Sequence, residues 1–388
     1  MAEKIIIEGP PQFIGKHCET SSLKKVLDYH RLSLSEEMLF GLGGGAGFIY
    51  WYMKLMLSPF IGTRYGKVGD FLTGICQRIG TKATVMETGS SAKAYDELKT
   101  LLRSGEPAIC WVDMPYLPYL FIPEVAHFGG HAIVVFGLDE EQDTVYILDR
   151  GKGPVTASIS ELQKARGSKF PPYPPKNRLL KIKFPPRILS LEVGIKESIR
   201  DCCRNMLNPP IKSIGLAGMQ KWANIITTWP KQFKGHYLYG CLFGTFINIE
   251  TGGTGGSAFR PMYAQFLEEV SDIINEPDLK EVAETFRNSG KVWSEIATGV
   301  LPDACPTLKR TRELMIEKNR LFEEQPPGFL ESIKKTNGEL EFLQTRMNEE
   351  MGAELENAPE FLLDAKQFIL KCYKLEKQAF QKLDGIVK

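Results

Sequence analysis

The sequence lacks the features that mark several whole classes of protein. Its 388 residues carry 48 basic and 47 acidic side chains, so no excess of positive charge is available for a nucleic acid or a membrane surface. Its eight cysteines form no Cys-x-x-Cys pair, and no apolar export signal follows the initial Met-Ala-Glu-Lys. We therefore expect a cytoplasmic protein with reduced thiols, no metal, no nucleic-acid partner and no membrane partner.

The stretch from Leu39 to Gly62 comes nearest to a membrane-spanning segment. Lys54 interrupts it, five glycines crowd its first half, and Pro59 lies near its end. These residues would make a poor membrane span. We expect instead a buried helix over residues 48–57, entered through a glycine turn. No Gly-Lys-Ser/Thr ends the glycine-rich stretch 41–47, so it is not a phosphate loop, and it either lines an acyl channel or allows a close helix–helix approach.

The apolar periodicity is mixed in the first half of the chain and almost wholly helical in the second. Prolines cluster between Phe170 and Pro186, where they block both helix and interior strand. The pattern predicts an α+β fold with two domains, residues 1–186 and a mostly α-helical domain at 187–388. Helices are expected at 18–31, 68–79, 95–103, 194–207, 213–228, 237–246, 261–274 and 280–298, with two or three more over 307–388 around breaks at 337–338 and 359; strands are expected at 82–87, 107–112, 132–137, 144–148 and 179–184.

The stretch Lys16-His17-Cys18-Glu19-Thr20 opens the first expected helix. Backbone N–H groups and the helix dipole stabilise a thiolate at such a position, which makes Cys18 a candidate nucleophile. A lone cysteine there is also commonly a packing residue. The order of its candidate partners favours the nucleophile, because His131 begins one strand after two glycines and Asp149 closes the next.

Brought together, these residues would form a Cys-His-Asp triad. Cys18 would attack an acyl carbon, His131 would accept and return the proton, and Asp149 would fix the imidazole. The alternatives are a glycine-turn histidine bonded to backbone and an aspartate that caps a turn. His127 is the rival base, whereas His17 is too close to Cys18 along the chain.

Three further residues are candidates for contact with substrate. Gln12, six positions before Cys18, is the candidate oxyanion donor, and a surface glutamine is an equally good interpretation. Glu250 and Arg260 flank a second glycine loop in the helical half. They are expected either to bind substrate at the domain interface or to belong to a plain interhelical turn.

Several of these motifs resemble the butirosin biosynthesis protein H family. They are His17-Cys18-Glu19-Thr20, the run 39–48, Gly-Gly-His131 with Leu-Asp149-Arg, and the segment 160–166. In the second half of the chain, the segments 249–260 and 266–267 resemble the helical domain that often accompanies that family. The resemblance implies a papain-like N-terminal domain, in which the oxyanion glutamine precedes the cysteine by the same six positions as Gln12. It also implies transfer of an acyl group from a carrier-protein thioester to an amine.

An amide-forming acyltransferase of antibiotic or related secondary metabolism is the function we favour. Its expected partners are an acyl or peptidyl carrier protein, which delivers the substrate on its phosphopantetheine arm, and a small amine; no cofactor of its own is expected. The same triad would serve a cysteine peptidase or a thioesterase, which must admit water. A non-catalytic binding protein is a third alternative. The second domain is expected to cover the active-site cleft, and its C-terminal helices are candidate contacts for a homo-oligomer.

Overall fold

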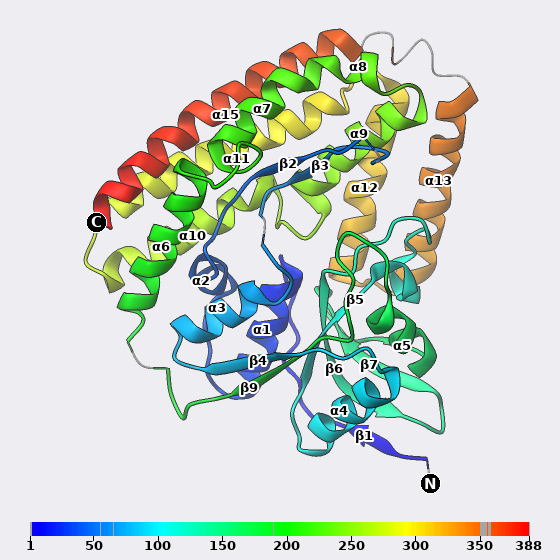
Figure 1. Ribbon diagram of the computed structural model, residues 1–388. Helices are drawn as coiled ribbons and strands as arrows, with labels where there is room; N and C mark the ends of the chain where they lie inside the picture. Colours follow the sequence, from blue (N-terminus) through cyan, green and yellow to red (C-terminus); the bar gives the residue numbers. More distant parts are fainter. Residues whose placement is uncertain are drawn as a thin grey trace. The chain divides into compact units, whose positions relative to one another are not determined.

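The computed structural model describes residues 2–54, 56–64, 66–188, 190–349, 355 and 358–387 (Figure 1). They divide into two compact units, each built from several segments of the chain. The sheet unit comprises Met1–Leu39, Gly66–Ser190 and Arg320–Asn337; the helical unit comprises Phe40–Tyr65, Leu191–Asn319 and Gly338–Lys388. The structure therefore differs from a single division at residue 186, because the early segment 40–65 belongs with the helices and the late segment 320–337 belongs with the sheet.

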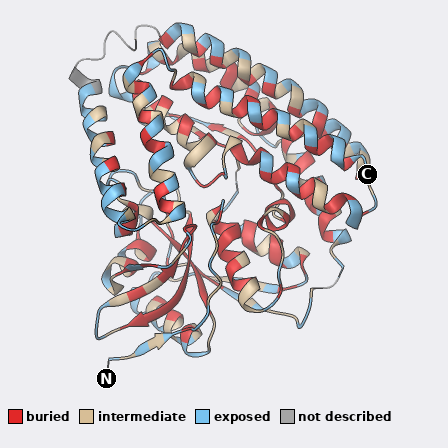
Figure 2. Ribbon diagram, turned by 180° about the vertical axis from the view of Figure 1, so that it is seen from behind, coloured by how far each residue is buried: buried red, intermediate tan, exposed pale blue. Residues whose placement is uncertain are grey.

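One antiparallel sheet forms the centre of the sheet unit. Its order is β4-β9-β5-β6-β7-β8, with β1 also paired to β6. His131 pairs with Val112 where β6 begins and β5 ends. Every residue of β5 and β6 is buried, so the strand that carries His131 is rigidly held (Figure 2). The strands are β1 Lys4–Ile6, β4 Lys82–Met86, β5 Ala108–Val112, β6 His131–Asp139, β7 Thr144–Leu148, β8 Val155–Ala157 and β9 Leu179–Lys183.

The helices of the sheet unit include α1, which begins at Cys18. Leu23, Val26 and Leu27 form the buried face of α1, which packs against β6. A capping box opens α5, in which Ser158 and Glu161 satisfy each other's backbone N–H groups. The helices are α1 Cys18–Tyr29, α3 Asp70–Arg78, α4 Ser91–Arg103 and α5 Ile159–Gly167, with the short 3₁₀ turns Met114–Tyr116 and Pro118–Leu120; α2 Glu36–Leu42 begins in this unit.

Long helices make up most of the helical unit, and α15 packs along α11, α7 and α6 (Figure 1). Aromatic rings fill its core: Phe48 stacks on Trp222, and Trp222 stacks on Trp293. The helices are α6 Glu192–Leu207, α7 Gly215–Ile225, α8 Trp229–Gln232, α9 His236–Phe246, α10 Arg260–Ile273, α11 Leu279–Val300 and α15 Ala358–Ile386; α12 Pro306–Glu324 and α13 Phe329–Glu349 each have residues in both units. Among the described residues, no helix is long and apolar enough to cross a membrane.

The helix expected over residues 48–57 is wrong; residue 55 lies outside the described residues. Residues Ile49–Trp51 form β2, which pairs with β3 (Phe60–Gly62) and bridges to Ile214. The branched and aromatic side chains of β2 favour a strand. Gly45 has a positive φ of 63°, and a Cβ atom there would overlap the ring of Tyr263. The glycine stretch therefore permits close packing within the helical unit, as one of the two interpretations expected.

The last helices differ from expectation at one of the two breaks. Helix α13 runs through Asn337 and Gly338 without interruption. A single glycine costs a helix only about 1 kcal/mol, which burial of Ile333 and Thr336 on the same helix offsets. Helix α15 begins at Ala358, and proline is tolerated in a first turn; the break expected at Pro359 stays a prediction, because residues 356 and 357 lie outside the described residues. Residues 350–354, 356, 357 and 388 of the expected segment lie outside the described residues.

Candidate active site

Cys18 is the first residue of α1 and is half-buried, whereas the other seven cysteines of the chain are fully buried. Burial raises the pKa of Cys76 to about 11 and that of Cys202 to about 12, so these thiols stay protonated. His17 precedes Cys18 in an extended conformation and ends the loop that leads into α1. Cys18 is therefore the one cysteine whose side chain is partly exposed.

A carboxylate from α2 holds the loop that carries Cys18. Glu36 accepts the backbone N–H groups of Lys16 and His17 at 3.0 and 2.8 Å, and the hydroxyl of Thr20 at 2.8 Å. Burial raises the pKa of Glu36, and the hydrogen bonds act in the opposite direction. The side chain of His17, the N-cap residue, makes no capping hydrogen bond to α1. Glu36 instead accepts the backbone N–H of His17 at this end of the helix. Sequence analysis missed Glu36 because no motif links it to Cys18.

The imidazole of His131 lies between a carboxylate and the Cys18 thiol. Its Nε2 is 2.8 Å from Oδ2 of Asp149, and both side chains are buried. Burial disfavours the imidazolium, but the charge and hydrogen bond of Asp149, together with Cys18, outweigh it and raise the pKa of His131 to about 10. The contribution of Cys18 to this rise indicates that its thiol lies near the ring. Because Nε2 is taken by Asp149, Nδ1 is the nitrogen left for the sulfur.

Two further donors fix the carboxylate of Asp149. The hydroxyl of Tyr119 donates to Oδ2 at 3.0 Å, and the backbone N–H of Arg150 donates to Oδ1 at 2.7 Å. Burial acts to raise the pKa of Asp149, yet His131 and Arg150 hold it below its ordinary value. Burial also raises the pKa of Tyr119 well above its usual range, so the phenol remains a donor. The group facing His131 is therefore a fully hydrogen-bonded carboxylate.

His127 belongs to a different aspartate–histidine pair. Its Nδ1 is 2.8 Å from Oδ2 of Asp113, which is fully buried and also accepts the hydroxyl of Ser168 at 2.6 Å and the N–H of Phe128 at 2.9 Å. The ring of His127 stacks on Phe170. Of the two histidines, it is His131 that the structure brings to Cys18.

Gln12 lies in the extended segment that precedes α1 and is exposed. Its Oε1 is 3.9 Å from the position that a Cβ atom on Gly153 would take, so the carboxamide borders the loop that follows Asp149. The role of Gln12 as an oxyanion donor stays a prediction.

Glu250 closes the second glycine loop of the helical unit. It accepts the backbone N–H of Ser257 at 3.1 Å and the hydroxyl of Ser294 at 2.6 Å. Both bonds stay within this unit and tie the loop to α11, as in the interhelical-turn interpretation.

Arg260 is fully buried in the helical unit. Its Nε and Nη2 lie 2.7 and 2.8 Å from the two carboxylate oxygens of Glu376, and Nη1 donates to the carbonyl oxygens of Gly47 and Ala258. Removing one partner of a buried ion pair of this kind strongly destabilises a protein. The expectation that Arg260 binds substrate is not supported, because the guanidinium is enclosed and its donors are engaged.

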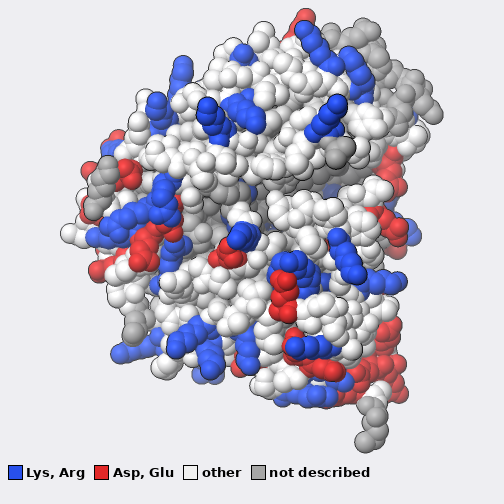
Figure 3. All heavy atoms as spheres, in the orientation of Figure 1, with Lys and Arg blue, Asp and Glu red and all other residues white. Residues whose placement is uncertain are grey.

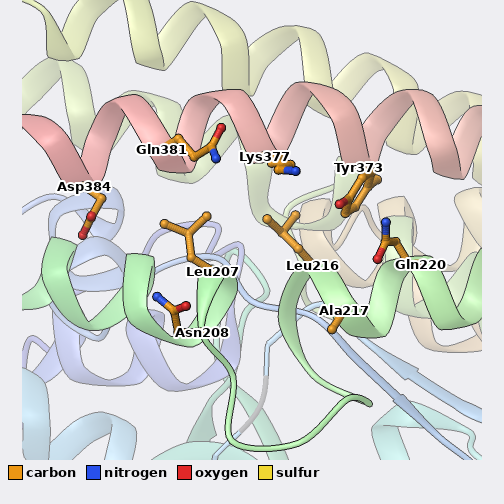
Figure 4. Close-up of a pocket in the computed structure, with 9 residues that line it drawn as sticks. All are labelled: Leu207, Asn208, Leu216, Ala217, Gln220, Tyr373, Lys377, Gln381 and Asp384. Carbon is orange, nitrogen blue, oxygen red and sulfur yellow. The ribbon is translucent and has the colours of Figure 1, made fainter.

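The helical unit also contains a hollow of about 550 Å³ between α6, α7 and α15 (Figure 4). Polar side chains such as Gln220, Tyr373 and Lys377 line it, and none of the predicted site residues does. Among the described residues, no cluster of three or more His, Cys, Asp or Glu side chains is arranged to hold a metal ion. Basic and acidic side chains are interspersed on the surface seen in Figure 3.

Comparison with known families covers most of the chain. Residues 17–150 match the family described as butirosin biosynthesis protein H, N-terminal, and this range contains Cys18, His131 and Asp149. Residues 160–317 match a domain of unknown function, DUF4872. No significant match is found among curated proteins. Over its residues 17–150, the chain is similar to the butirosin biosynthesis protein H family.

Proposed function

We propose that this protein is an acyltransferase that forms an amide through an acyl-enzyme on Cys18. The arrangement that carries the proposal is a half-buried cysteine at the start of α1 near the buried imidazole of His131, whose Nε2 lies 2.8 Å from Asp149. An imidazole whose pKa is raised by a buried carboxylate accepts the proton of a thiol, which activates the sulfur as a nucleophile. A cysteine that opens the first long helix and a histidine that opens a central strand support a papain-like fold for the sheet unit.

In the first step, Cys18 takes an acyl group from a thioester. His131 accepts the thiol proton, and the sulfur attacks the carbonyl carbon to give a tetrahedral intermediate. The carbon–sulfur bond of the donor then breaks, and the leaving thiolate takes the proton from His131. Asp149 stabilises the imidazolium throughout. The backbone N–H of Cys18 and the carboxamide of Gln12 are the proposed donors to the oxyanion.

In the second step, an amine attacks the acyl-enzyme. Neutral His131 accepts a proton from the attacking nitrogen, the bond between the acyl carbon and the sulfur of Cys18 breaks, and an amide leaves. Transfer to an amine requires that water be kept away from the acyl-enzyme. A peptidase or thioesterase would use the same three residues and release a free acid.

The family's description supports a place in antibiotic biosynthesis. For such a pathway we propose an acyl or peptidyl carrier protein as donor, with the acyl group on its phosphopantetheine thiol, and a small amine as acceptor. The enzyme itself needs no cofactor in this chemistry, because thioester exchange followed by aminolysis involves neither redox change nor added energy.

The test is to incubate the protein with acyl-pantetheine or acyl-carrier thioesters, with and without a panel of amines, and to identify products by mass spectrometry. Amide formation that depends on both Cys18 and an amine is expected. Release of free acid alone, whichever amine is offered, would instead assign a hydrolase.

A further inference from the structure

The C-terminal end of α12 and the residue after it pack against the loop that follows Asp149. The carbonyl oxygen of Glu323 accepts the N–H of Lys152 at 2.8 Å, and its carboxylate lies 3.0 Å from the guanidinium of Arg150. The carboxamide oxygen of Gln325 accepts the N–H of Gly153. We call Phe322, Glu323 and Gln325 the buttress.

Phe322 connects the buttress to the carboxylate of Asp149 through one side chain. Its ring stacks on Tyr119 at 6.4 Å with only 7° between the planes, and the hydroxyl of Tyr119 donates to Asp149. The guanidinium of Arg150 lies over the ring of Phe322, 5.4 Å from its centroid. Stacking and cation–π contacts of this kind stabilise the position of both rings.

The buttress fits this loop closely. A Cβ atom on Gly151 would lie 2.5 Å from the carboxamide nitrogen of Gln325 and 2.7 Å from the carbonyl oxygen of Phe322, so only glycine is accommodated. Gln325 itself has a φ of 49°, a left-handed conformation that is unfavourable for a non-glycine residue. Its contacts with the loop offset this cost.

The same loop is tied to the segment before Cys18. The N–H of Gly15 donates to the carbonyl oxygen of Arg150 at 2.7 Å, and Gly15 lies three residues before Cys18. The loop that the buttress contacts therefore touches both the carboxylate end and the thiol end of the candidate triad.

We propose that the buttress is a positioning element of the active site, which holds Tyr119 and the loop after Asp149 so that the carboxylate keeps its place against His131. Its residues lie outside both matched ranges, 17–150 and 160–317, so neither family domain contains this element. Its effect on catalysis rests on the proposed function, but its effect on His131 is measurable without any substrate.

Loss of the buttress weakens the coupling between Asp149 and His131. Without Phe322, one face of Tyr119 opens to water, and the higher local dielectric reduces the attraction between carboxylate and imidazolium. We expect the pKa of His131 to fall by about one unit, and acyl loading of Cys18 to slow about tenfold.

The experiment titrates His131 in the full-length protein by NMR after ¹⁵N-histidine labelling. The chain has five histidines, and a His131→Gln sample assigns the signal. Phe322→Ala and Glu323→Gln are expected to lower the pKa of His131, and Phe322→Leu, which keeps the apolar volume, is expected to restore most of it. Glu324→Gln is the matched control, since Glu324 is exposed and pairs with Arg320.

Glu323→Gln and Phe322→Leu keep the test valid even where Phe322→Ala does not fold. If the titration of His131 is unchanged in every folded buttress variant, the inference is overturned and the proposed function is left intact. A wild-type protein that never acylates Cys18 refutes the proposed function, whereas a shifted titration in the same samples still supports the buttress as a positioning element.

Discussion

Replacing Asp149 with asparagine removes the charge that gives His131 its high proton affinity but keeps the size of the side chain. Burial alone disfavours the imidazolium, so the pKa of His131 should fall from about 10 to below its ordinary value of 6.5. The asparagine amide can also donate toward Nε2 and thereby stabilise the tautomer that carries its proton on Nδ1. That tautomer cannot accept the proton of Cys18.

The size of the effect follows from the pKa of His131 in the wild type and in the Asp149→Asn variant. A fall of more than three pKa units corresponds to about 4–5 kcal/mol, at about 1.4 kcal/mol per unit. The less basic imidazole takes the proton of the Cys18 thiol less readily. We expect acylation of Cys18 to slow by about a thousandfold, or about 4 kcal/mol in activation free energy.

Two measurements check this prediction. Single-turnover acylation by a thioester, quenched in acid and read by intact mass, gives the rate, and the ¹⁵N-histidine titration gives the pKa of His131. Asp139→Asn is a suitable control, because Asp139 is buried at the far end of β6 and pairs with Lys4 at 2.9 Å. It should leave both quantities unchanged. An Asp149→Asn protein that still loads within tenfold of the wild-type rate would refute the assigned role of Asp149.

Other predictions concern residues around the triad. Burial lowers the pKa of Lys25 to about 8, and its amine lies 4.0 Å from the ring centroid of Phe13 without a hydrogen-bond partner among the described residues. Lys25→Met should therefore stabilise the protein at pH 7 by up to about 3 kcal/mol in denaturant unfolding. Between pH 8 and 10.5 the Lys25 amine is protonated in the unfolded chain but not in the folded one, so the stability gained by Lys25→Met should fade over that range. Equal stabilities of wild type and Lys25→Met at pH 7 would disprove the prediction. The contribution of His131 to folding stability has the opposite sign, because its raised pKa stabilises the folded protein. This stabilisation is complete below about pH 6.5 and disappears as the pH rises through about 10. His127→Gln should retain acyl loading within about threefold and His131→Gln should abolish it; the reverse result would reassign the base.

Elements with a strong local pattern were predictable from the sequence. The first helix, the hairpin of β6 and β7, and most helices beyond residue 190 lie close to their expected ranges. The positions of Cys18, His131 and Asp149 at the ends of these elements could be predicted for the same reason. A helix start and two strand ends are marked by local periodicity and by turn residues.

Features that depend on distant packing were not predictable. Residues 49–51 form a strand in the helical unit, where Phe48 stacks on Trp222, and no local period records that contact. Glu36, Tyr119 and Glu323 act as hydrogen-bond or ion partners far along the chain from the residues they hold. Such residues occur throughout any sequence, so only the fold distinguishes them.

The central claim is that an acyl group resides on one sulfur during the reaction. The most direct measurement is peptide mapping of the protein quenched after incubation with an acyl-pantetheine thioester and no amine. The predicted result is the mass of the acyl group on the peptide that contains Cys18, lost when amine is added and absent from a folded Cys18→Ala variant. A wild-type protein without that adduct, or an equal adduct on Cys18→Ala, would contradict the account.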